Sequence, residues 1–276
     1  MNQEKKQDLQ EKAREVRIET LKSIGHLGVG HVGGAMSIVE VLTYLYYAEM
    51  NVNPQEPRMN DRDRLVLSKG HAGPALYSIL AMKGFFPKEW LLTLNQGGTN
   101  LPSHCDRNRT PGIDMTTGSL GQGLSAAVGI ALATRLNKTD NRVFAIIGDG
   151  ESQEGQNWEA AMSAAQFKLG RLIAFTDYNK MQIDGMTEDI MDLAALENKW
   201  ESFGWHAQRI DGHDFEALAE AVKRAKEETD RPSMIVLDTI KGKGCSFAEN
   251  KLGSHNMPVS ADDLKEALAA LGEGEN

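Results

Sequence analysis

Short apolar runs alternate with helical stretches along this chain, and no other feature constrains the fold as strongly. Strands that are continuously apolar and separated by helices imply a parallel sheet that is buried on both faces. The sequence therefore predicts an α/β fold, doubly wound, with a mainly parallel sheet and helices on both faces. The predicted strands cover residues 64–67, 143–147, 172–176, 205–210 and 234–239.

The predicted helices follow the apolar spacing of one buried stripe, or are apolar on most sides. They cover residues 3–24, 36–47, 74–83, 121–136, 157–168, 193–203 and 215–228. We expect a glycine-dense turn at 25–34, an ordered loop at 241–260 and a frayed tail, GEGEN, at 272–276. No repeat or Pro/Ser-rich linker divides the sequence, so we predict a single domain over residues 1–276.

The charge balance limits the partners that this protein can bind. It has 30 Lys and Arg against 39 Asp and Glu, a formal net charge of −9, which disfavours nucleic acid or an anionic membrane. Cys105 and Cys245 lie far apart and are expected to be free thiols in a reducing compartment. The charged N-terminal stretch does not resemble a signal peptide, and no apolar run is long enough for a membrane span, so we expect a cytoplasmic protein.

Two oxygen-bearing side chains follow two successive predicted strands. Asp149, within Gly-Asp-Gly, follows strand 143–147, and Asn179 follows strand 172–176. If these strands are neighbours, their ends lie about 4.8 Å apart, or twice that if one strand lies between them. Carboxylate and amide oxygens suit Mg²⁺ or Ca²⁺ better than zinc. Such a cation could hold a diphosphate on an acidic protein, with the flanking glycines letting backbone N–H groups approach the phosphate oxygens.

The spacing of these residues resembles the thiamine diphosphate motif, and the surrounding sequence resembles transketolase. QEG (153–155) and NKMQIDG (179–185) carry this likeness most specifically. Further stretches agree in order along the chain: GHVGGAMS (30–37), LVLSKGHAGPALYSIL (65–80), TTGSLGQGLSAAVGIALA (116–133), DGHD (211–214) and TIKGKG (239–244). The likeness covers about residues 14–260 and implies the thiamine-diphosphate-binding fold.

The resemblance also implies roles for individual residues. The metal would be bound by the side chains of Asp149 and Asn179 and the backbone carbonyl of Met181. The diphosphate would contact Gly150, His71 and His255. Asn179 would bind the cofactor as well as the metal. The thiazolium ring would be packed by Gly118, Leu120, Ile183 and Ile240. The reacting carbon and the sugar hydroxyls would face His31, His71, His104 and His255. Glu154 resembles an acid that lies near the cofactor at the interface between protomers in this family.

The histidines support this interpretation independently. Five of the seven are predicted in glycine-rich or turn-rich loops, namely His26, His31, His71, His104 and His255. Ketol transfer needs groups that pass protons near neutral pH, which histidine can do. His206 and His213 are better interpreted as structural, and His26 matches no position of the family. Lys69 stands where the family commonly has Asn, and the sequence leaves open whether it lies near phosphate or is solvated.

The sequence resembles only the first of the three transketolase domains. The pyrimidine-binding domain, whose glutamate protonates the aminopyrimidine ring of the cofactor, has no counterpart in this sequence, and neither has the region that grips the sugar phosphate. We therefore expect the N-terminal subunit of a split transketolase, which acts on phosphorylated sugars and is inactive without a C-terminal partner subunit, in an α₂β₂ assembly. The alternatives are a subunit of another thiamine diphosphate enzyme, such as one like deoxyxylulose-phosphate synthase or one acting on an unusual sugar, and a non-catalytic subunit that keeps the fold.

Overall fold

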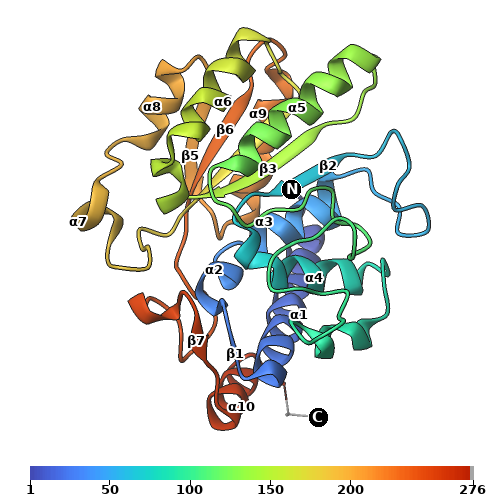
Figure 1. Cartoon of the computed structure of the whole chain (residues 1–276), viewed down its shortest axis with the longest axis vertical. Helices are drawn as coiled ribbons and strands as arrows, with labels where there is room; N and C mark the ends of the chain where they lie inside the picture. Colours follow the sequence, from blue (N-terminus) through green and yellow to red (C-terminus); the bar gives the residue numbers. More distant parts are fainter. Residues whose placement is uncertain (274–276) are drawn as a thin grey trace.

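A parallel five-stranded sheet forms the centre of the computed structural model, which describes residues 1–273 (Figure 1). The strand order is β2-β3-β4-β6-β5, and every neighbouring pair is parallel. The strands are β2 (Arg64–Leu67), β3 (Val143–Gly148), β4 (Leu172–Tyr178), β5 (His206–Asp211) and β6 (Ser233–Asp238). The predicted α/β fold is confirmed, and all five predicted strands occur within two residues of their predicted bounds.

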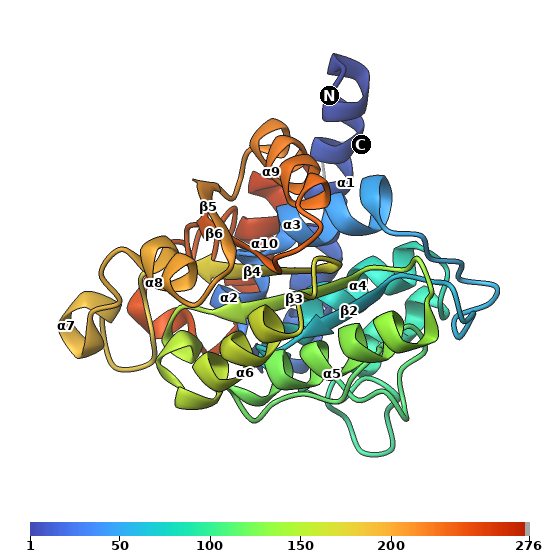
Figure 2. The same cartoon turned by 90° about the horizontal axis from the view of Figure 1, so that it is seen from above.

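Helices cover both faces of this sheet. They are α1 (Gln3–Leu27), α2 (Val32–Met36), α3 (Val39–Tyr44), α4 (Gly73–Met82), α5 (Gln122–Asn137), α6 (Gly155–Gln166), α7 (Thr187–Met191), α8 (Leu196–Ser202), α9 (Phe215–Glu227) and α10 (Ala261–Ala270). Figure 2 shows α5 and α6 on one side of the sheet and α1, α3 and α9 on the other. Within residues 1–273, no helix has the length and apolar character needed to cross a membrane.

The central strands supply side chains to two separate cores, which explains why they are apolar throughout. In β3, Phe144 and Ile146 belong to the core beneath α1, α3, α4 and α9. Val143, Ala145 and Ile147 belong to the core beneath α5, α6 and α8. Because successive residues of a strand point to opposite faces, a strand covered on both sides must be apolar at every position.

One predicted helix is divided in the structure, and another begins later than predicted. The helix predicted at 36–47 comprises the end of α2, then α3, then a π-turn at Leu45–Glu49. The break after α2 lies at Ser37, whose hydroxyl donates to the Asp177 carboxylate (Oγ–Oδ2 2.6 Å) instead of facing outward from a continuous helix. The helix predicted at 193–203 begins only at Leu196, because Ala194 adopts a left-handed conformation (φ 47°) in the preceding turn.

The glycine-dense segment is more ordered than the turn that we predicted at 25–34. Helix α1 runs on to Leu27 and ends where Gly28 adopts φ 83°, a conformation that favours glycine. His26 therefore lies on this helix, and its predicted loop position is wrong. The next residues form β1 (Val29–Gly30), which pairs with β7 (Met257–Pro258). A two-residue strand has no sequence period, so this pairing was not predictable.

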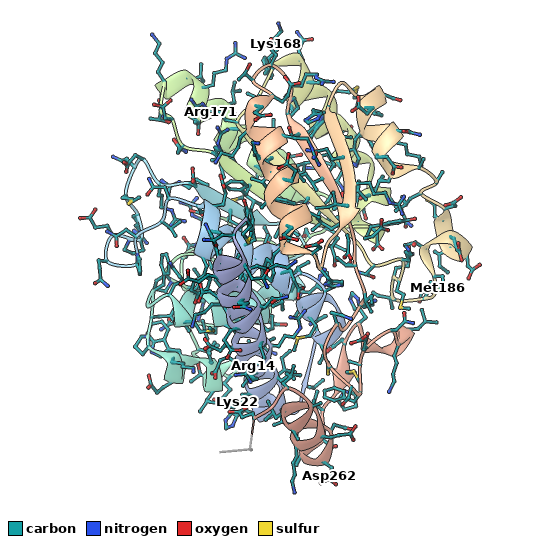
Figure 3. The ribbon with its side chains drawn as sticks, turned by 180° about the vertical axis from the view of Figure 1, so that it is seen from behind. Arg14, Lys22, Lys168, Arg171, Met186 and Asp262 are labelled. Carbon is teal, nitrogen blue, oxygen red and sulfur yellow. The ribbon has the colours of Figure 1, made fainter. Side chains whose placement is uncertain are left out.

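The last helix, α10, was also absent from the prediction. It begins at a capping box in which Ser260 and Asp263 exchange hydrogen bonds, and it packs against α1. Of the tail expected to fray, residues 274–276 lie outside the described residues. Figure 3 labels Asp262 on α10 at one end of the molecule, and Lys168 and Arg171 at the opposite end, beside the amino ends of β3 and β4. The carboxyl ends of the strands therefore lie in the middle of the molecule, where the candidate site forms.

Candidate active site

Three oxygen-bearing groups meet where β3 and β4 end. The two strands are direct neighbours, with Gly148 opposite Asp177, so the closer of the two arrangements left open by the sequence holds. Asp149 accepts hydrogen bonds from the backbone N–H of Gly150 (Oδ1–N 2.7 Å) and of Lys180 (Oδ2–N 2.6 Å). A cavity of about 210 Å³ is lined by this carboxylate together with Asn179 and Met181. The structure therefore brings the three predicted metal ligands to one site.

Asp177, which the sequence analysis missed, orients the side chain of Asn179. The amide nitrogen of Asn179 donates to Asp177 (Nδ2–Oδ2 3.0 Å), and the amide oxygen accepts from the Met181 backbone N–H (Oδ1–N 3.2 Å). Asp177 is fully buried and also accepts from Ser37, Lys69 and Thr239. The pKa of Asp177 is lowered, because Lys69 and these hydroxyls outweigh the cost of burying its charge. A charged residue at the end of an apolar strand was the signal that could have revealed it.

The residues at this site fit a divalent cation. Asp149 is buried, and its pKa is raised to about 7 by burial and by the charge of Asp177, so its carboxylate lacks sufficient positive charge nearby. The Met181 carbonyl already accepts a hydrogen bond from a cation, the ammonium of Lys241 (Nζ–O 3.3 Å). One carboxylate, one amide oxygen and one carbonyl form a set of hard donors that leaves positions for phosphate and water, as Mg²⁺ requires.

Two buried lysines place positive charge on the wall of the same cavity. Lys69 forms an ion pair with Asp177 (Nζ–Oδ2 2.5 Å), so of the two possibilities left open by the sequence, the solvated one is wrong. Lys241 is also buried, and burial and the charge of Lys69 lower its pKa to about 8. The two lysines offset only part of the negative charge that Asp149, Asp177 and Glu151 bring to this cavity. A divalent cation would supply the remaining positive charge that a bound anion needs.

A second carboxylate, Glu151, is buried beside the cavity and was not predicted. It accepts hydrogen bonds from the Ser68 hydroxyl and from the backbone N–H groups of Gly121 (2.9 Å) and Gly148 (3.0 Å). Burial raises its pKa despite these donors. By joining the end of β2, the start of α5 and the end of β3, Glu151 fixes the backbone around Asp149. Its position one residue after Gly-Asp-Gly was the only sequence signal for it.

Four of the predicted histidines form a cluster at the mouth of the cavity. The ring centroid of His31 lies 5.3 Å from those of His71 and His255 and 5.7 Å from that of His104. His71 and His255 are 4.9 Å apart and line the cavity itself. The pKa values of His31 and His255 are lowered to about 4, mainly by burial and also by neighbouring histidines and lysines. These imidazoles are therefore neutral at pH 7 and can accept protons or hydrogen bonds.

The cluster predicts that the protein loses stability in acid. Histidines whose pKa is lowered on folding bind fewer protons in the folded than in the unfolded state, so stability falls as the pH drops from 6.5 towards 4. We expect His31 and His255 to contribute a loss of about 1 kcal/mol each by pH 5, after allowance for solvent screening. Urea unfolding at pH 7.5 and pH 5 measures this loss.

The matched comparison is the double variant His31→Asn, His255→Asn, whose unfolding free energy should fall less between the two pH values. Asp149 and Glu151, whose raised pKa values act in the opposite direction, are common to both proteins and cancel in the difference. The variant His26→Asn, at an exposed position of α1, serves as the control. An equal loss of stability in wild type and double variant would contradict the prediction.

The other predicted site residues are distributed around this cavity. Gly150, Leu120 and Ile183 line it, and the last two are exposed large apolar residues at its edge. Gly118 lies against His104, whereas Ile240 and Glu154 do not line the cavity. Glu154 is exposed at the start of α6. Of the two histidines interpreted as structural, His206 lies in β5, and His213 hydrogen-bonds Glu40 and Ile240.

Comparison with known proteins gives one family and several relatives. The family described as "Transketolase, thiamine diphosphate binding domain" matches residues 9–275. A 6-deoxy-6-sulfo-D-fructose transketolase subunit from Clostridium sp. (strain MSTE9) is 60% identical over 96% of each chain. One of the subunits of an apulose-4-phosphate transketolase from Actinobacillus succinogenes is 36% identical, also over 96% of each chain. The crystal structure of transketolase from Campylobacter jejuni superposes with a TM-score of 0.91 at 32% identity, over 99% of this chain and 43% of that one.

Proposed function

This chain belongs to the transketolase family and matches transketolase subunits over nearly their whole length, and from that premise we propose that it transfers a two-carbon ketol unit from a ketose to an aldose together with a second chain. The observation that carries this proposal is the meeting of Asp149, Asn179 and Met181 oxygens beneath a cluster of neutral histidines. A non-catalytic subunit would have no use for either group.

We assign Asp149, Asn179 and the Met181 carbonyl to a divalent metal, Mg²⁺ or Ca²⁺. Lys69 and Lys241 add positive charge for the diphosphate, with His71, Gly150 and His255 at its edges. Bound thiamine diphosphate supplies the reactive carbon for ketol transfer. Leu120 and Ile183 at the cavity edge, together with Gly118 and Ile240, would form the apolar surround that keeps water from the thiazolium ring.

In this proposal, the histidine cluster accepts and donates protons during ketol transfer. The four histidines are close enough to act on one small polar substrate, since five of their six ring pairs have centroids 4.9–6.5 Å apart. They are His31, His71, His104 and His255. Because burial keeps His31 and His255 neutral at pH 7, each can accept a proton from a sugar hydroxyl and return it as the bond to the two-carbon unit breaks and forms.

The second chain would complete the site. The protein spans 96% of the length of its subunit relatives but 43% of the Campylobacter transketolase. We propose that the missing pyrimidine-binding and C-terminal domains are supplied by a C-terminal partner subunit in an α₂β₂ assembly, with Glu154 at the interface. Leu120 and Ile183 are 39% and 68% exposed beside the cavity, and contact with the partner would bury them. Both cysteines are free and buried, which fits the cytoplasm.

For the donor, we propose a sulfonated ketose, 6-deoxy-6-sulfo-D-fructose, which is the sugar named for the relative at 60% identity. A sulfonate carries a single negative charge, whereas a phosphate ester carries about 1.5 to 2 near neutral pH. If the positive charge of a binding pocket matches one of these anions, it does not balance the charge of the other. We therefore expect kcat/KM for the sulfonated ketose to exceed that for fructose 6-phosphate by about 10–100-fold.

The experiment combines this chain with its partner subunit, thiamine diphosphate and Mg²⁺, and measures ketol transfer to an aldose phosphate from each donor in turn. A preference for fructose 6-phosphate would favour a transketolase of the pentose phosphate type and overturn the proposed donor. Absence of transfer from every ketose, despite tight cofactor binding, would overturn the transketolase proposal itself. Transfer from apulose 4-phosphate provides the comparison with the subunits of the other named specificity.

A further inference from the structure

A chain of three polar side chains lies beneath the segment that follows β6, outside the cavity described above. It consists of Arg17 on α1, Glu40 on α3 and His213 in the turn after β5, and all three are largely buried. Arg17 and His213 contact residues 239–244, the TIKGKG motif, called here the 239–244 segment. These helices and this turn are far apart in sequence and have no other part in the site.

His213 holds the backbone of the 239–244 segment at Ile240. The backbone N–H of Ile240 donates to His213 (N–Nε2 2.9 Å), and since an N–H can only donate, Nε2 carries no proton. The proton of the neutral ring is therefore on Nδ1, which lies 3.0 Å from Glu40 Oε2 and donates to it. Glu40 thus fixes the tautomer in which His213 can accept from Ile240.

Arg17 completes the chain and contacts the same segment a second time. Its guanidinium pairs with both carboxylate oxygens of Glu40 (Nη2–Oε1 2.7 Å, Nη2–Oε2 2.9 Å), and its Nε donates to the Lys243 carbonyl at 2.8 Å. Burial would raise the pKa of Glu40, but Arg17 and His213 outweigh it and lower that pKa. At the next residue, Gly244, a Cβ atom would lie 2.8 Å from Arg17 Nε, so glycine is needed for this approach.

The two contacts lie on either side of Lys241, the residue that reaches the cavity. Lys241 donates to the Met181 carbonyl, and Thr239 donates to Asp177, which in turn holds Asn179. Movement of the 239–244 segment would therefore displace an ammonium group and one hydroxyl partner of Asp177 together. An apolar contact could cover this segment, but it could not fix the position of its backbone, because dispersion contacts have no direction and hydrogen bonds do.

We propose that Arg17, Glu40 and His213 are positioning residues that hold the 239–244 segment in the position from which Lys241 reaches the cofactor cavity. They touch neither cofactor nor substrate. This inference rests on the proposed function, in that it assumes that the cavity binds thiamine diphosphate. It explains why charged side chains are buried here. Apolar side chains of similar volume would stabilise the fold at least as well, because they carry no desolvation penalty.

The test compares His213→Ala, which leaves the Ile240 N–H without an acceptor, with His213→Gln, whose amide oxygen can occupy the place of Nε2. In the assembled enzyme with Mg²⁺, calorimetry should give a Kd for thiamine diphosphate about tenfold higher in His213→Ala, with recovery towards wild type in His213→Gln. His206→Ala, at a partly buried histidine in β5, is the matched control and should leave Kd unchanged.

Two readouts on the free chain do not depend on the cofactor. Nitrogen-15 chemical shifts should show His213 protonated at Nδ1 in wild type, with the tautomers mixing in Glu40→Gln. The amide of Ile240 should exchange with solvent about tenfold faster in His213→Ala and regain its protection in His213→Gln. An Nε2-protonated ring in wild type, or a lower melting temperature in His213→Ala with Kd unchanged, would overturn the positioning role. Failure of wild type to bind thiamine diphosphate would instead count against the proposed function.

Discussion

Assayed alone with thiamine diphosphate, Mg²⁺ and a ketose donor, this chain will show no measurable ketol transfer, and addition of the partner subunit will restore it. The physical reason is that the cavity of this chain is suited to one end of the cofactor only. Its cavity is lined by Asp149, Asn179 and two lysines, which we propose bind a metal and a diphosphate. In the proposed assembly, the partner subunit supplies the glutamate that protonates the aminopyrimidine ring, and loss of one acid–base group costs about 10²–10⁴ in rate. A coupled assay at constant chain concentration measures the difference.

Titration with the partner also reports how the two chains assemble. If sites form at the interface, activity should rise with partner concentration and reach a plateau at a ratio of one to one, as an α₂β₂ assembly requires. Heat-denatured partner is the control for a contaminating transketolase. Turnover by the chain alone at the rate of the mixture would refute the split-subunit proposal, whatever its effect on cofactor binding.

Replacing Asp149 with Ala will abolish metal-dependent binding of thiamine diphosphate. Asp149 is the only carboxylate among the three proposed ligands, so its loss removes the formal negative charge that the cation needs. Mutation of a residue that only hydrogen-bonds to a metal ligand costs about 10–100-fold in metal affinity. Because Asp149 is a proposed ligand itself, we expect the Kd for thiamine diphosphate in the assembled enzyme to rise more than about 100-fold. Calorimetric titrations with and without Mg²⁺ measure this, and the variant should show weak binding that no longer depends on Mg²⁺.

The stability of the Asp149→Ala variant separates lost binding from unfolding. The pKa of Asp149 is raised to about 7, so at pH 8 the ionised carboxylate is less favourable in the folded protein than in the unfolded chain. The metal-free variant should therefore be folded at pH 8, with no large drop in its melting temperature. Asp189→Asn, an exposed carboxylate on α7, is the matched control. A variant that keeps wild-type affinity and Mg²⁺ dependence would contradict the assignment of Asp149.

Where sequence patterns and simple topology were enough, the prediction came close to the structure. The five strands were located from their apolar runs, and the end of β3 lies next to that of β4, as a crossover between neighbouring parallel strands allows. The meeting of Asp149 and Asn179 at the cavity was predictable for two reasons. Each follows an apolar run that forms a strand, and the carboxyl ends of parallel strands lie at the same edge of a sheet. The histidine cluster followed from motifs, since three of its four members lie in loops and His71 lies in a short 3-10 turn, and the structure brings the four rings together.

Contacts between distant segments were beyond the sequence. Asp177 receives Ser37 from 140 residues away and Lys69 from 108, and neither pairing leaves a local pattern. The environment of Lys69 stayed open for this reason, because a lysine's partner is chosen by packing and not by its neighbours in the chain. The divided helix at 36–47 and the late start of α8 have a similar cause. Ser37 hydrogen-bonds Asp177 and Ala194 lies in a left-handed turn, and the apolar period shows neither.

The sequence by itself determined the architecture and the chemical class of the site, because periodicity and strand-end position are local properties that each segment carries with it. Only the tertiary structure decided the protonation and orientation of the groups there. The neutral state of His31, the amide orientation of Asn179 and the tautomer of His213 each depend on burial and on partners from other elements. Those quantities are set by the local dielectric and by hydrogen-bond geometry, which exist only once the chain has packed.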